Sequence, residues 1–296
     1  EPTLILSEGK PIRFVRNEIL GEPHNWHDMG YSYPDFVDWD GDGVRDLVCP
    51  NETNRIFWYR NIGSPRSPRF GPRQQIECDD FPDSPDLLSL SASRASDPKS
   101  NNGVYPFEKE QPFMWRTGAA LADFNGDGLM DLVTHSGERP VAKLFVQYRH
   151  NDQTLRLRAD QELQLEDGTP ISDAIVSRRS HWTESFRAID WDEDGLQDLI
   201  YSVAGSRNGT KDGGSIYLLR NVGTKTVPRF AEPVTMRCFG EAISITSHGP
   251  HPWPGDFDGD GKPDLITCVE WSVYPFYSHA ALMMKERPSY LLELIE

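Results

Sequence analysis

The sequence has little positive charge and no long apolar run. Its 30 Lys and Arg residues stand against 46 Asp and Glu residues, which gives a formal net charge of −16. The phosphates of nucleic acids and the anionic surfaces of membranes repel such a chain, so neither is expected as its main partner. A membrane-spanning helix needs a run of about 18 apolar residues. The sequence contains no such run, so membrane insertion is not expected either.

Cysteine is scarce, and several common catalytic signatures are absent. The four cysteines form no Cys-x-x-Cys pair, and the chain has no Gly-x-Ser-x-Gly, Walker or Gly-x-Gly-x-x-Gly motif. For the cysteines, buried thiols and one or two disulfides both stay open. Glycine and proline are abundant by contrast, with 24 and 23 residues. Many turns are therefore expected, as in an all-β chain of short strands.

Four copies of an acidic nonapeptide organise the chain. Each copy has Asp at its first, fifth and ninth positions, Asp or Asn at its third and Gly at its sixth, and Leu-Val or Leu-Ile follows it. The copies begin at Asp38, Asp123, Asp190 and Asp256, at intervals of 85, 67 and 66 residues. A pattern that recurs in this way is typical of a repeat protein, in which each copy is one supersecondary unit.

A second repeat follows the first and third copies. Residues 60–70 and 220–230 both read Arg-Asn-x-Gly and then Pro-Arg-Phe, and strand-like runs precede them. Asn-x-Gly followed by Pro predicts a turn between two strands. Each unit thus reads as strand, acidic loop, strand, variable loop, strand, turn and strand. This pattern predicts an all-β fold, a β-propeller of four-stranded blades with Asp-rich, Ca²⁺-binding loops.

We expect one β-propeller domain over residues 1–296. Four blades are clear from the repeats, and a fifth blade or membership of a larger propeller stays open. The interval of 85 residues contains a segment rich in Ser, Asp and Pro at about 79–111. This composition predicts a long surface loop inserted between two blades.

The acidic nonapeptides are predicted metal sites. Side-chain oxygens at positions 1, 3, 5 and 9, with the backbone carbonyl at position 7, form an all-oxygen cage that suits Ca²⁺. Gly at position 6 permits the left-handed turn that folds these ligands inward. Up to four structural Ca²⁺ ions are expected. The predicted ligands are Asp38, Asp40, Asp42, Val44, Asp46, Asp123, Asn125, Asp127, Leu129, Asp131, Asp190, Asp192, Asp194, Leu196, Asp198, Asp256, Asp258, Asp260, Lys262 and Asp264.

Two other interpretations compete with this one. An EF-hand loop needs Glu at its twelfth position, where this chain has Cys49, Thr134, Tyr201 and Thr267. A set of solvated Asp-Gly turns would leave many carboxylates close together without a cation, which is unfavourable. Four copies in the same repeat context favour metal binding. The aromatic residue at position 2 of each copy is expected to pack in the core.

The loops, the Leu-Val or Leu-Ile that follows them and the Arg-Asn-x-Gly turn resemble the FG-GAP/VCBS repeats of calcium-binding β-propellers. The resemblance covers the chain from about Asp38 to the C-terminus. It implies a β-propeller fold and bound Ca²⁺. Propellers of this kind include adhesion heads, lectins and polysaccharide lyases, so the resemblance does not by itself determine an activity.

Aromatic and basic residues gather just before the acidic loops. The 14 residues that precede each first Asp include four of the eight Trp and five of the eight His in the chain. In an up-and-down blade these segments share the face opposite the acidic loops. Trp rings stack on sugar rings, and Arg pairs with carboxylate or sulfate groups. The predicted substrate-binding residues are Trp26, Trp115, Trp182 and Trp253.

The favoured function is that of a secreted or cell-surface polysaccharide lyase that acts on an acidic, uronate-containing glycan. A His or Tyr base would remove the proton α to the uronate carboxylate, and Arg or His would stabilise the resulting anion. Propeller lyases, some of which use His, Tyr and Arg, support this by analogy. The predicted catalytic residues are His27, Tyr33, Arg116, His181, Arg187 and His251. Weak Ca²⁺ sites need the high Ca²⁺ concentration found outside cells, which favours that location.

Other functions stay open. A non-catalytic module for glycan recognition or adhesion needs the same aromatic residues but no base. A glycosidase, with Asp28 and Glu184 as its carboxylates, would require a set distance between the two groups. For each single residue a purely structural role also competes, because Trp can fill the propeller channel and His can satisfy backbone groups. The oligomeric state and the identity of the sugar are left undetermined.

Overall fold

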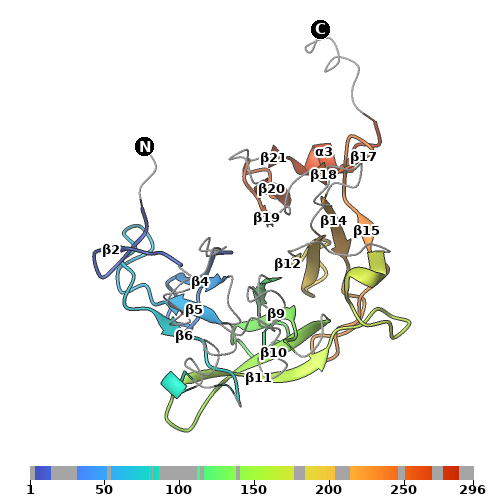
Figure 1. Ribbon diagram of the computed structural model, residues 1–296. Coiled ribbons are helices and arrows are strands. Elements are labelled where there is room, and N and C mark those ends of the chain that lie inside the picture. Colours follow the sequence, from blue (N-terminus) through green and yellow to red (C-terminus); the bar gives the residue numbers. More distant parts are fainter. Residues whose placement is uncertain are drawn as a thin grey trace, which may run out of the picture. The chain divides into compact units, whose positions relative to one another are not determined.

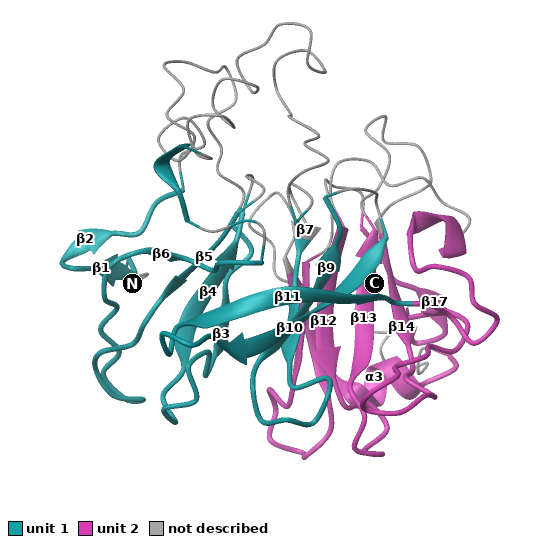
Figure 2. Cartoon of the chain, turned by 90° about the horizontal axis from the view of Figure 1, so that it is seen from below, with its two compact units in different colours: residues 1–163 teal, residues 164–296 magenta. Residues whose placement is uncertain are grey.

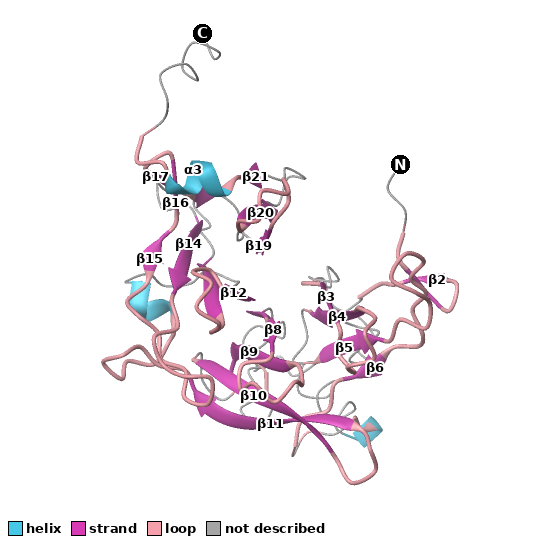
Figure 3. Cartoon of the chain, turned by 180° about the vertical axis from the view of Figure 1, so that it is seen from behind, coloured by secondary structure: helices cyan, strands magenta, loops and turns pink. Residues whose placement is uncertain are grey.

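Strands, turns and irregular loops make up almost all of the residues that the computed structural model describes, and the helices among them are short (Figure 3). The structure describes residues 4–14, 32–51, 55–79, 81, 83–86, 112–113, 117–137, 141–176, 184–203, 214–245, 251–268 and 276–286. Within these residues, no helix has the length and apolar character that crossing a membrane requires. The chain divides into two compact units, residues 1–163 and 164–296 (Figure 2).

The first unit contains two antiparallel blades of four strands each (Figure 1). Blade 1 pairs its strands in sequence order, as β3 (Asp35–Val37), β4 (Asp46–Pro50), β5 (Ile56–Tyr59) and β6 (Gln74–Gln75). Blade 2 consists of β8 (Ala120–Ala122), β9 (Asp131–His135), β10 (Ala142–Arg149) and β11 (Leu155–Glu162). The unit also holds β7 (Thr117–Gly118) and a hairpin of β1 (Leu6–Ser7) and β2 (Lys10–Pro11).

The second unit contains the other two blades. Blade 3 consists of β12 (Glu184–Ile189), β13 (Asp198–Val203), β14 (Gly214–Leu219) and β15 (Val234–Thr235). Blade 4 has three described strands, β19 (His251–Gly255), β20 (Asp264–Cys268) and β21 (Phe276–Tyr277), and helix α3 (His279–Met283) follows them. Smaller elements are the 3₁₀ turn η2 (Asp173–Val176), the hairpin β16 (Arg237–Cys238) with β17 (Glu241–Ala242), and β18 (Ser244–Ile245), which pairs with β14.

These sheets are the blades of a β-propeller, so the predicted fold class is confirmed. In every blade the acidic loop joins the first two strands, as the repeat pattern predicts. The single domain over residues 1–296 stays a prediction. Most of the expected insertion at 79–111 lies outside the described residues.

The strand that follows the acidic loop forms the centre of each core. Every residue of β4, β9 and β13 is buried. Successive side chains of a strand point to opposite faces. The adjacent Leu47 and Val48 are therefore buried on two sides of blade 1, each in a different apolar cluster. Each such side chain contributes roughly 1.5–3 kcal/mol to folding. The Leu-Val and Leu-Ile pairs are thus the sequence signature of a strand buried on both faces.

The aromatic residue at position 2 of the acidic loops was predicted to pack in the core, and in three of the four copies it does. Trp39 and Phe124 are 1% and 3% exposed. Trp191 is partly buried and packs against the core of the second unit. The prediction is wrong for Phe257, which is 49% exposed. Its ring instead lies against the backbone of Gly255, at the end of its own strand β19.

Candidate functional site

The first Asp of each acidic loop holds the loop in shape. In blade 1, Asp38 accepts hydrogen bonds from the backbone N–H groups of Gly41, Asp42 and Gly43 at 2.9–3.0 Å. Asp123, Asp190 and Asp256 accept equivalent bonds in the other three loops. The sixth-position glycines have φ between +81° and +87°, in the left-handed region that the sequence predicts. Hydrogen bonds from the loop's own backbone N–H groups to the first Asp carboxylate thus hold each loop in shape.

This folding brings carboxylates together. One oxygen from each of the first, third and fifth residues lies within 4.8 Å of the others in three loops, at Asp38, Asp40 and Asp42, at Asp190, Asp192 and Asp194, and at Asp256, Asp258 and Asp260. In the second loop Asn125 takes the third position and donates its side-chain N–H to Asp127 at 3.0 Å. Clustered carboxylate oxygens are ligands that suit a hard divalent cation. Each of the three Asp clusters could therefore hold a metal ion.

The ninth residue of each loop lies apart from the first, third and fifth residues. It is fully buried in all four loops, and it is not a member of the 4.8 Å clusters. Each of these carboxylates accepts a backbone hydrogen bond from a residue beyond the blade's second strand. The pairs are Asp46 with Asn61 (2.7 Å), Asp131 with Gln147 (2.9 Å), Asp198 with Asn221 (2.6 Å) and Asp264 with His279 (2.7 Å).

The second oxygen of the ninth residue turns back to its own loop in three of the four copies. In Asp131, Asp198 and Asp264 it accepts the N–H of the second residue, at 3.0–3.1 Å. Burial raises the pKa of Asp46, Asp131 and Asp198 to about 6, although backbone hydrogen bonds lower it. The ninth residue thus ties the acidic loop to the next part of the blade. Its predicted role as a ligand stays a prediction.

The Arg-Asn-x-Gly turn completes this network in blades 1 and 3. The side-chain oxygen of Asn61 accepts the N–H groups of Gly63 and Arg69, both at 3.0 Å, and Asn221 repeats both contacts. A Cβ atom at Gly63 would lie 2.3 Å from the carbonyl oxygen of Ser67, so no larger residue fits. The predicted turn is confirmed, and its link to the acidic loop is a contact that the sequence pattern did not reveal.

Two arginines lie against the acidic clusters. The Nε atom of Arg60 is 2.6 Å from Asp40, and its Nη2 atom is 3.0 Å from Asp42. Arg220 occupies the same position in blade 3, with Nη1 at 3.5 Å from Asp192. The Arg60 guanidinium is a cation, and it contacts two carboxylates of the first loop at once. The donor set therefore fits a positively charged ligand in the first loop. The backbone carbonyls at Val44, Leu129, Leu196 and Lys262 stay predicted ligands.

A second candidate site lies on the first strands of blades 3 and 4. Strands β12 and β19 lie side by side. Arg187 on β12 is 2% exposed, and its Nε donates to the backbone oxygen of Pro252 at 3.2 Å. Its guanidinium lies 4.9 Å from the centre of the Trp253 ring, in a cation–π contact. Burial, and then the charge of Arg187, lower the pKa of His251 to about 3. The imidazole is therefore neutral at physiological pH.

A buried Glu–Tyr pair lies on the same blade. The hydroxyl of Tyr201 donates to the carboxylate of Glu184, and Phe186 stacks on Tyr201 with ring centres 4.9 Å apart. Burial and the Glu184 charge raise the pKa of Tyr201 well above its usual value. Glu184 was considered as a glycosidase carboxylate, whereas Tyr201 was missed. Its only sequence signal was its place two residues after Leu199, on the strand that follows the third acidic loop.

The structure brings together some of the predicted site residues. Arg187, His251 and Trp253 form one cluster. Tyr33 lies in the first unit, where it is 2% exposed and its backbone N–H donates to Pro50 at 2.9 Å. The remaining predicted catalytic and substrate-binding residues lie outside the described part of the chain, and they are His27, Arg116, His181, Trp26, Trp115 and Trp182.

The described cysteine side chains are thiols. Cys49 and Cys78 are buried and Cys238 is half-buried, and none of the three is in a disulfide. Burial raises the pKa of Cys49 above its usual range. All three have a packing role: Cys49 and Cys78 lie in apolar clusters of the first unit, and Cys238 on β16 packs against the core of the second unit.

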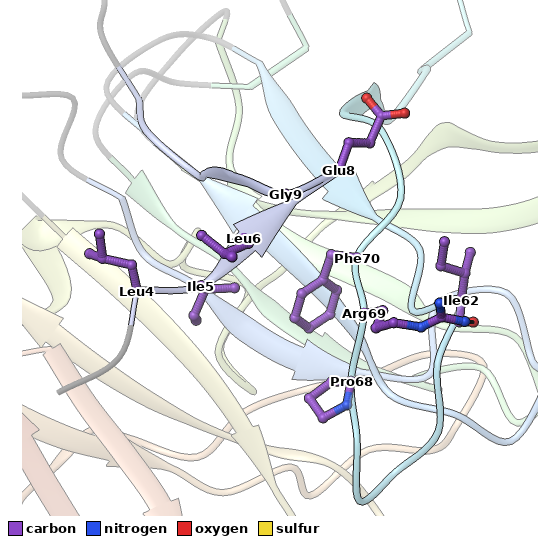
Figure 4. Close-up of a pocket in the computed structure, with 9 residues that line it drawn as sticks. All are labelled: Leu4, Ile5, Leu6, Glu8, Gly9, Ile62, Pro68, Arg69 and Phe70. Carbon is purple, nitrogen blue, oxygen red and sulfur yellow. Dashed lines mark hydrogen bonds between the residues drawn. The ribbon is translucent and has the colours of Figure 1, made fainter. Parts of the chain in front are cut away.

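An apolar groove lies in the first unit. It has a volume of about 620 Å³ and runs between the β1–β2 hairpin and the outer turn of blade 1. Figure 4 shows Phe70 between the hairpin residues Ile5 and Leu6 and the turn residues Pro68 and Arg69. The groove contains Glu8 and Arg69 as its charged lining residues. It offers none of the paired carboxylates or imidazoles that the proposed chemistry would need.

Comparison with known families supports the repeat assignment. Residues 190–267 match the FG-GAP-like repeat family. This segment runs from the third acidic loop through the fourth and into strand β20, so it contains two of the four nonapeptides. Together with the four blades, the match supports an FG-GAP β-propeller. No curated protein matches the chain.

Proposed function

We propose that this protein is a Ca²⁺-stabilised β-propeller that cleaves an acidic, uronate-containing polysaccharide by β-elimination, outside the cell. The observation that carries the proposal is the cluster of Arg187, His251 and Trp253 on two neighbouring first strands. It combines a base, a cation and a sugar-stacking ring. A base, a cation and a stacking ring are groups that β-elimination on a uronate can use.

The proposed reaction begins with removal of the proton α to the uronate carboxylate. His251 is the base, because its imidazole is neutral near pH 7 and a ring nitrogen can accept a proton. A pKa of about 3 makes it a weak base, so the proposal requires the negative charge of a bound uronate to raise this pKa towards neutrality. The electron pair left on carbon forms a double bond as the glycosidic bond to the neighbouring carbon breaks. The departing oxygen takes a proton from water, and His251 returns the proton that it accepted to water, so the step is balanced. Two fragments result. One carries the departing oxygen as a new reducing end or free hydroxyl, and the other ends in an unsaturated uronate.

Arg187 provides the positive charge. Removal of the α proton places extra negative charge on the uronate carboxylate, and a fixed cation in a site of low dielectric stabilises that charge. Arg187 is held by Pro252 and by the Trp253 ring, so its position is fixed before a substrate arrives. The same cation favours the neutral form of His251, because two positive charges would repel each other.

Ca²⁺ in the acidic loops is the second part of the proposal. The loops lie between the first and second strands of each blade, and their ninth residues are hydrogen-bonded to the rest of the blade. A bound cation would neutralise the clustered carboxylates and hold the first two strands at a fixed angle. Its role here is structural, and no step of the reaction is assigned to it.

The test is ultraviolet absorbance during incubation with a panel of uronate polysaccharides in Ca²⁺, because the conjugated unsaturated uronate absorbs strongly. We expect absorbance to rise with at least one substrate, and to be lost in His251→Asn. His150→Asn is the matched control, since His150 lies on a surface turn beside Asp152. A trace that stays flat across the panel would overturn the lyase. Equal rates in His251→Asn and the wild type would reject His251 as the base.

A glycan-binding module without catalysis is the second candidate. The observation that favours it is the burial of Arg187, whose side chain is 2% exposed and already engaged by Trp253 and Pro252. Such an arginine can support a binding surface without meeting a substrate carboxylate. Binding of a uronate polysaccharide, measured by calorimetry, with no rise in absorbance would favour this function. A reducing-end assay on the same panel would detect glycosidase action.

A further inference from the structure

The four acidic loops, numbered 1 to 4 with their blades (residues 38–46, 123–131, 190–198 and 256–264), differ in the residue that lies against their carboxylates. Arg60 comes directly before Asn61, whose N–H binds the ninth Asp of loop 1, and Arg220 has the same place before Asn221. The equivalent residues in the other two blades are Val146, before Gln147, and Ser278, before His279. Only two of the four loops therefore have an arginine at this position.

In loop 1 the arginine occupies the oxygens that a cation would use. The Oδ1 atoms of Asp40 and Asp42 accept backbone N–H groups of the loop itself. Their Oδ2 atoms are the ones that contact Arg60, at 2.6 and 3.0 Å. The loop thus has three carboxylates in its cluster and one guanidinium against two of them.

Loop 4 has the same carboxylates without the arginine. The Oδ1 atoms of Asp258 and Asp260 accept loop N–H groups, as in loop 1. Within the described residues, no hydrogen bond or ion pair reaches the Oδ2 atom of either residue. The lysine of this loop, Lys262, contacts Glu193 of loop 3 at 3.0 Å rather than its own cluster. Loop 4 therefore keeps its full negative charge for a cation.

We propose that the Arg60 guanidinium competes with a cation for the carboxylates of loop 1, and that Arg220 competes more weakly in loop 3. The inference rests on the proposed Ca²⁺ binding and adds an order to it: loop 4 fills at a lower Ca²⁺ concentration than loop 1. A cation that enters loop 1 must displace the guanidinium or share its carboxylates. Loop 3 is affected less, because Arg220 reaches a single carboxylate at 3.5 Å. Loop 2 differs from all three, because Asn125 removes one charge.

The exposure of the Arg60 ion pairs sets how much Arg60 changes the affinity of loop 1 for Ca²⁺. The Arg60 side chain is 48% exposed, so water screens its attraction to Asp40 and Asp42. Ion pairs of this kind contribute less than about 1 kcal/mol, which corresponds to a change in affinity of up to about fivefold. We therefore expect Arg60→Gln to raise the affinity of loop 1 for Ca²⁺ about two- to fivefold. Arg220→Gln should change loop 3 less than about twofold.

The experiment is a Ca²⁺ titration of the whole protein labelled with ¹⁵N-glycine, followed by NMR. The sixth-position glycines Gly43, Gly128, Gly195 and Gly261 donate their N–H groups to the first Asp of each loop. Their amide signals therefore report on the four loops one by one. We expect the Gly261 signal to reach its midpoint before that of Gly43. In Arg60→Gln the Gly43 midpoint should fall about two- to fivefold, while that of Gly261 stays unchanged.

Arg69→Gln is the matched control. Arg69 lies in the same turn as Arg60, but its guanidinium donates to the backbone oxygen of Ile62. This variant should leave the Gly43 midpoint where it is in the wild type. Unchanged signals from the other three loops show that a variant is folded.

Two results would overturn the inference. If the Gly43 midpoint in Arg60→Gln is unchanged or higher, Arg60 does not compete with the cation but is neutral or supports the loop. If no glycine signal responds to Ca²⁺ in any variant, the calcium part of the proposed function is wrong, and this inference with it. The absorbance assay tests the lyase reaction separately, so the failures can be told apart.

Discussion

The acidic loops and the Arg187 cluster are built in opposite ways. The acidic loop occurs four times, and the hydrogen bonds that shape it join residues two to seven positions apart. The Arg187 cluster occurs once, and its key hydrogen bond joins residues 65 positions apart. A loop made by local contacts can be copied from blade to blade. A site made by two strands that meet depends on the packing of particular blades.

The largest expected effect on the loops comes from removing the Ca²⁺ that we propose they bind. A ligand present at ten times its dissociation constant stabilises the folded state by about 1.4 kcal/mol per site, so four filled loops contribute roughly 5–6 kcal/mol. We expect a chelator to lower the midpoint of thermal unfolding by many degrees and added Ca²⁺ to restore it. Mg²⁺ at the same concentration is the control. An unchanged midpoint would show that the loops hold themselves without a cation.

Removal of the buried ninth Asp is the next largest effect. In Asp198→Ala the N–H groups of Trp191 and Asn221 lose their acceptor inside the protein. The Asn221 donor is buried and the Trp191 donor is partly buried. An unsatisfied buried donor costs about 1–3 kcal/mol and a partly buried one less, so we expect a loss of about 2–4 kcal/mol in the free energy of unfolding. Urea unfolding in a chelator measures it without any contribution from metal.

Asp167→Ala is the control for this substitution. Asp167 accepts the N–H of Thr169 in an exposed turn. Its removal should cost less than about 1 kcal/mol, because water can replace the lost acceptor. Equal losses in the two variants would mean that the ninth Asp does not hold the loop to the blade.

The Arg187 cluster should respond to pH through His251. The folded pKa of His251 is about 3, below the value of 6.5 for an ordinary histidine. Below pH 6.5 the unfolded chain takes up the proton more readily than the folded one, so stability falls as pH falls from 6.5 towards 3. Because the residue is only half-buried, we expect a contribution of about 1–2 kcal/mol between pH 7 and 4.

The measurement is the difference between the wild type and His251→Asn, unfolded in urea at several pH values. The difference removes the opposite contribution of Asp46, Asp131 and Asp198, whose raised pKa values favour the folded state as pH falls. Curves that run parallel at all pH values would contradict a His251 that stays neutral in the folded protein.

The smallest expected effect concerns position 4 of the acidic loops, where one copy departs from glycine. Position 4 has positive φ in all four loops, and it is Gly in three of them but Glu193 in the third, with φ of +61°. A side chain in this conformation costs roughly 1–2 kcal/mol. Glu193→Gly should therefore stabilise the protein by up to about 1 kcal/mol, after the loss of the exposed contact with Lys262.

Gln153→Gly is a useful comparison in the same urea assay, since Gln153 also has positive φ, at +68°, and no ion pair with a lysine. A gain in Gln153→Gly without one in Glu193→Gly would mean that the Lys262 contact is worth more than exposed ion pairs usually are.

Much of the fold followed from the repeats. The acidic nonapeptide, the Leu-Val pair and the Asn-x-Gly turn predicted the order of strands, loops and turns in the blades, because each depends on a few neighbouring residues. The same logic failed for Phe257, which shares its position with three packed aromatic residues but is exposed. Nothing local distinguishes it from Phe124. Whether an aromatic ring is covered depends on which other segment lies against it.

The candidate sites divide in the same way. The sequence by itself determined where the carboxylates of each acidic loop gather, because backbone hydrogen bonds within nine residues and a left-handed glycine fix their geometry. Only the tertiary structure decided that Arg60 lies on Asp40 and Asp42, and that Arg187 meets Trp253 and His251. These contacts join residues 18 to more than 60 positions apart in the chain, and such pairs come together only when whole strands pair and pack.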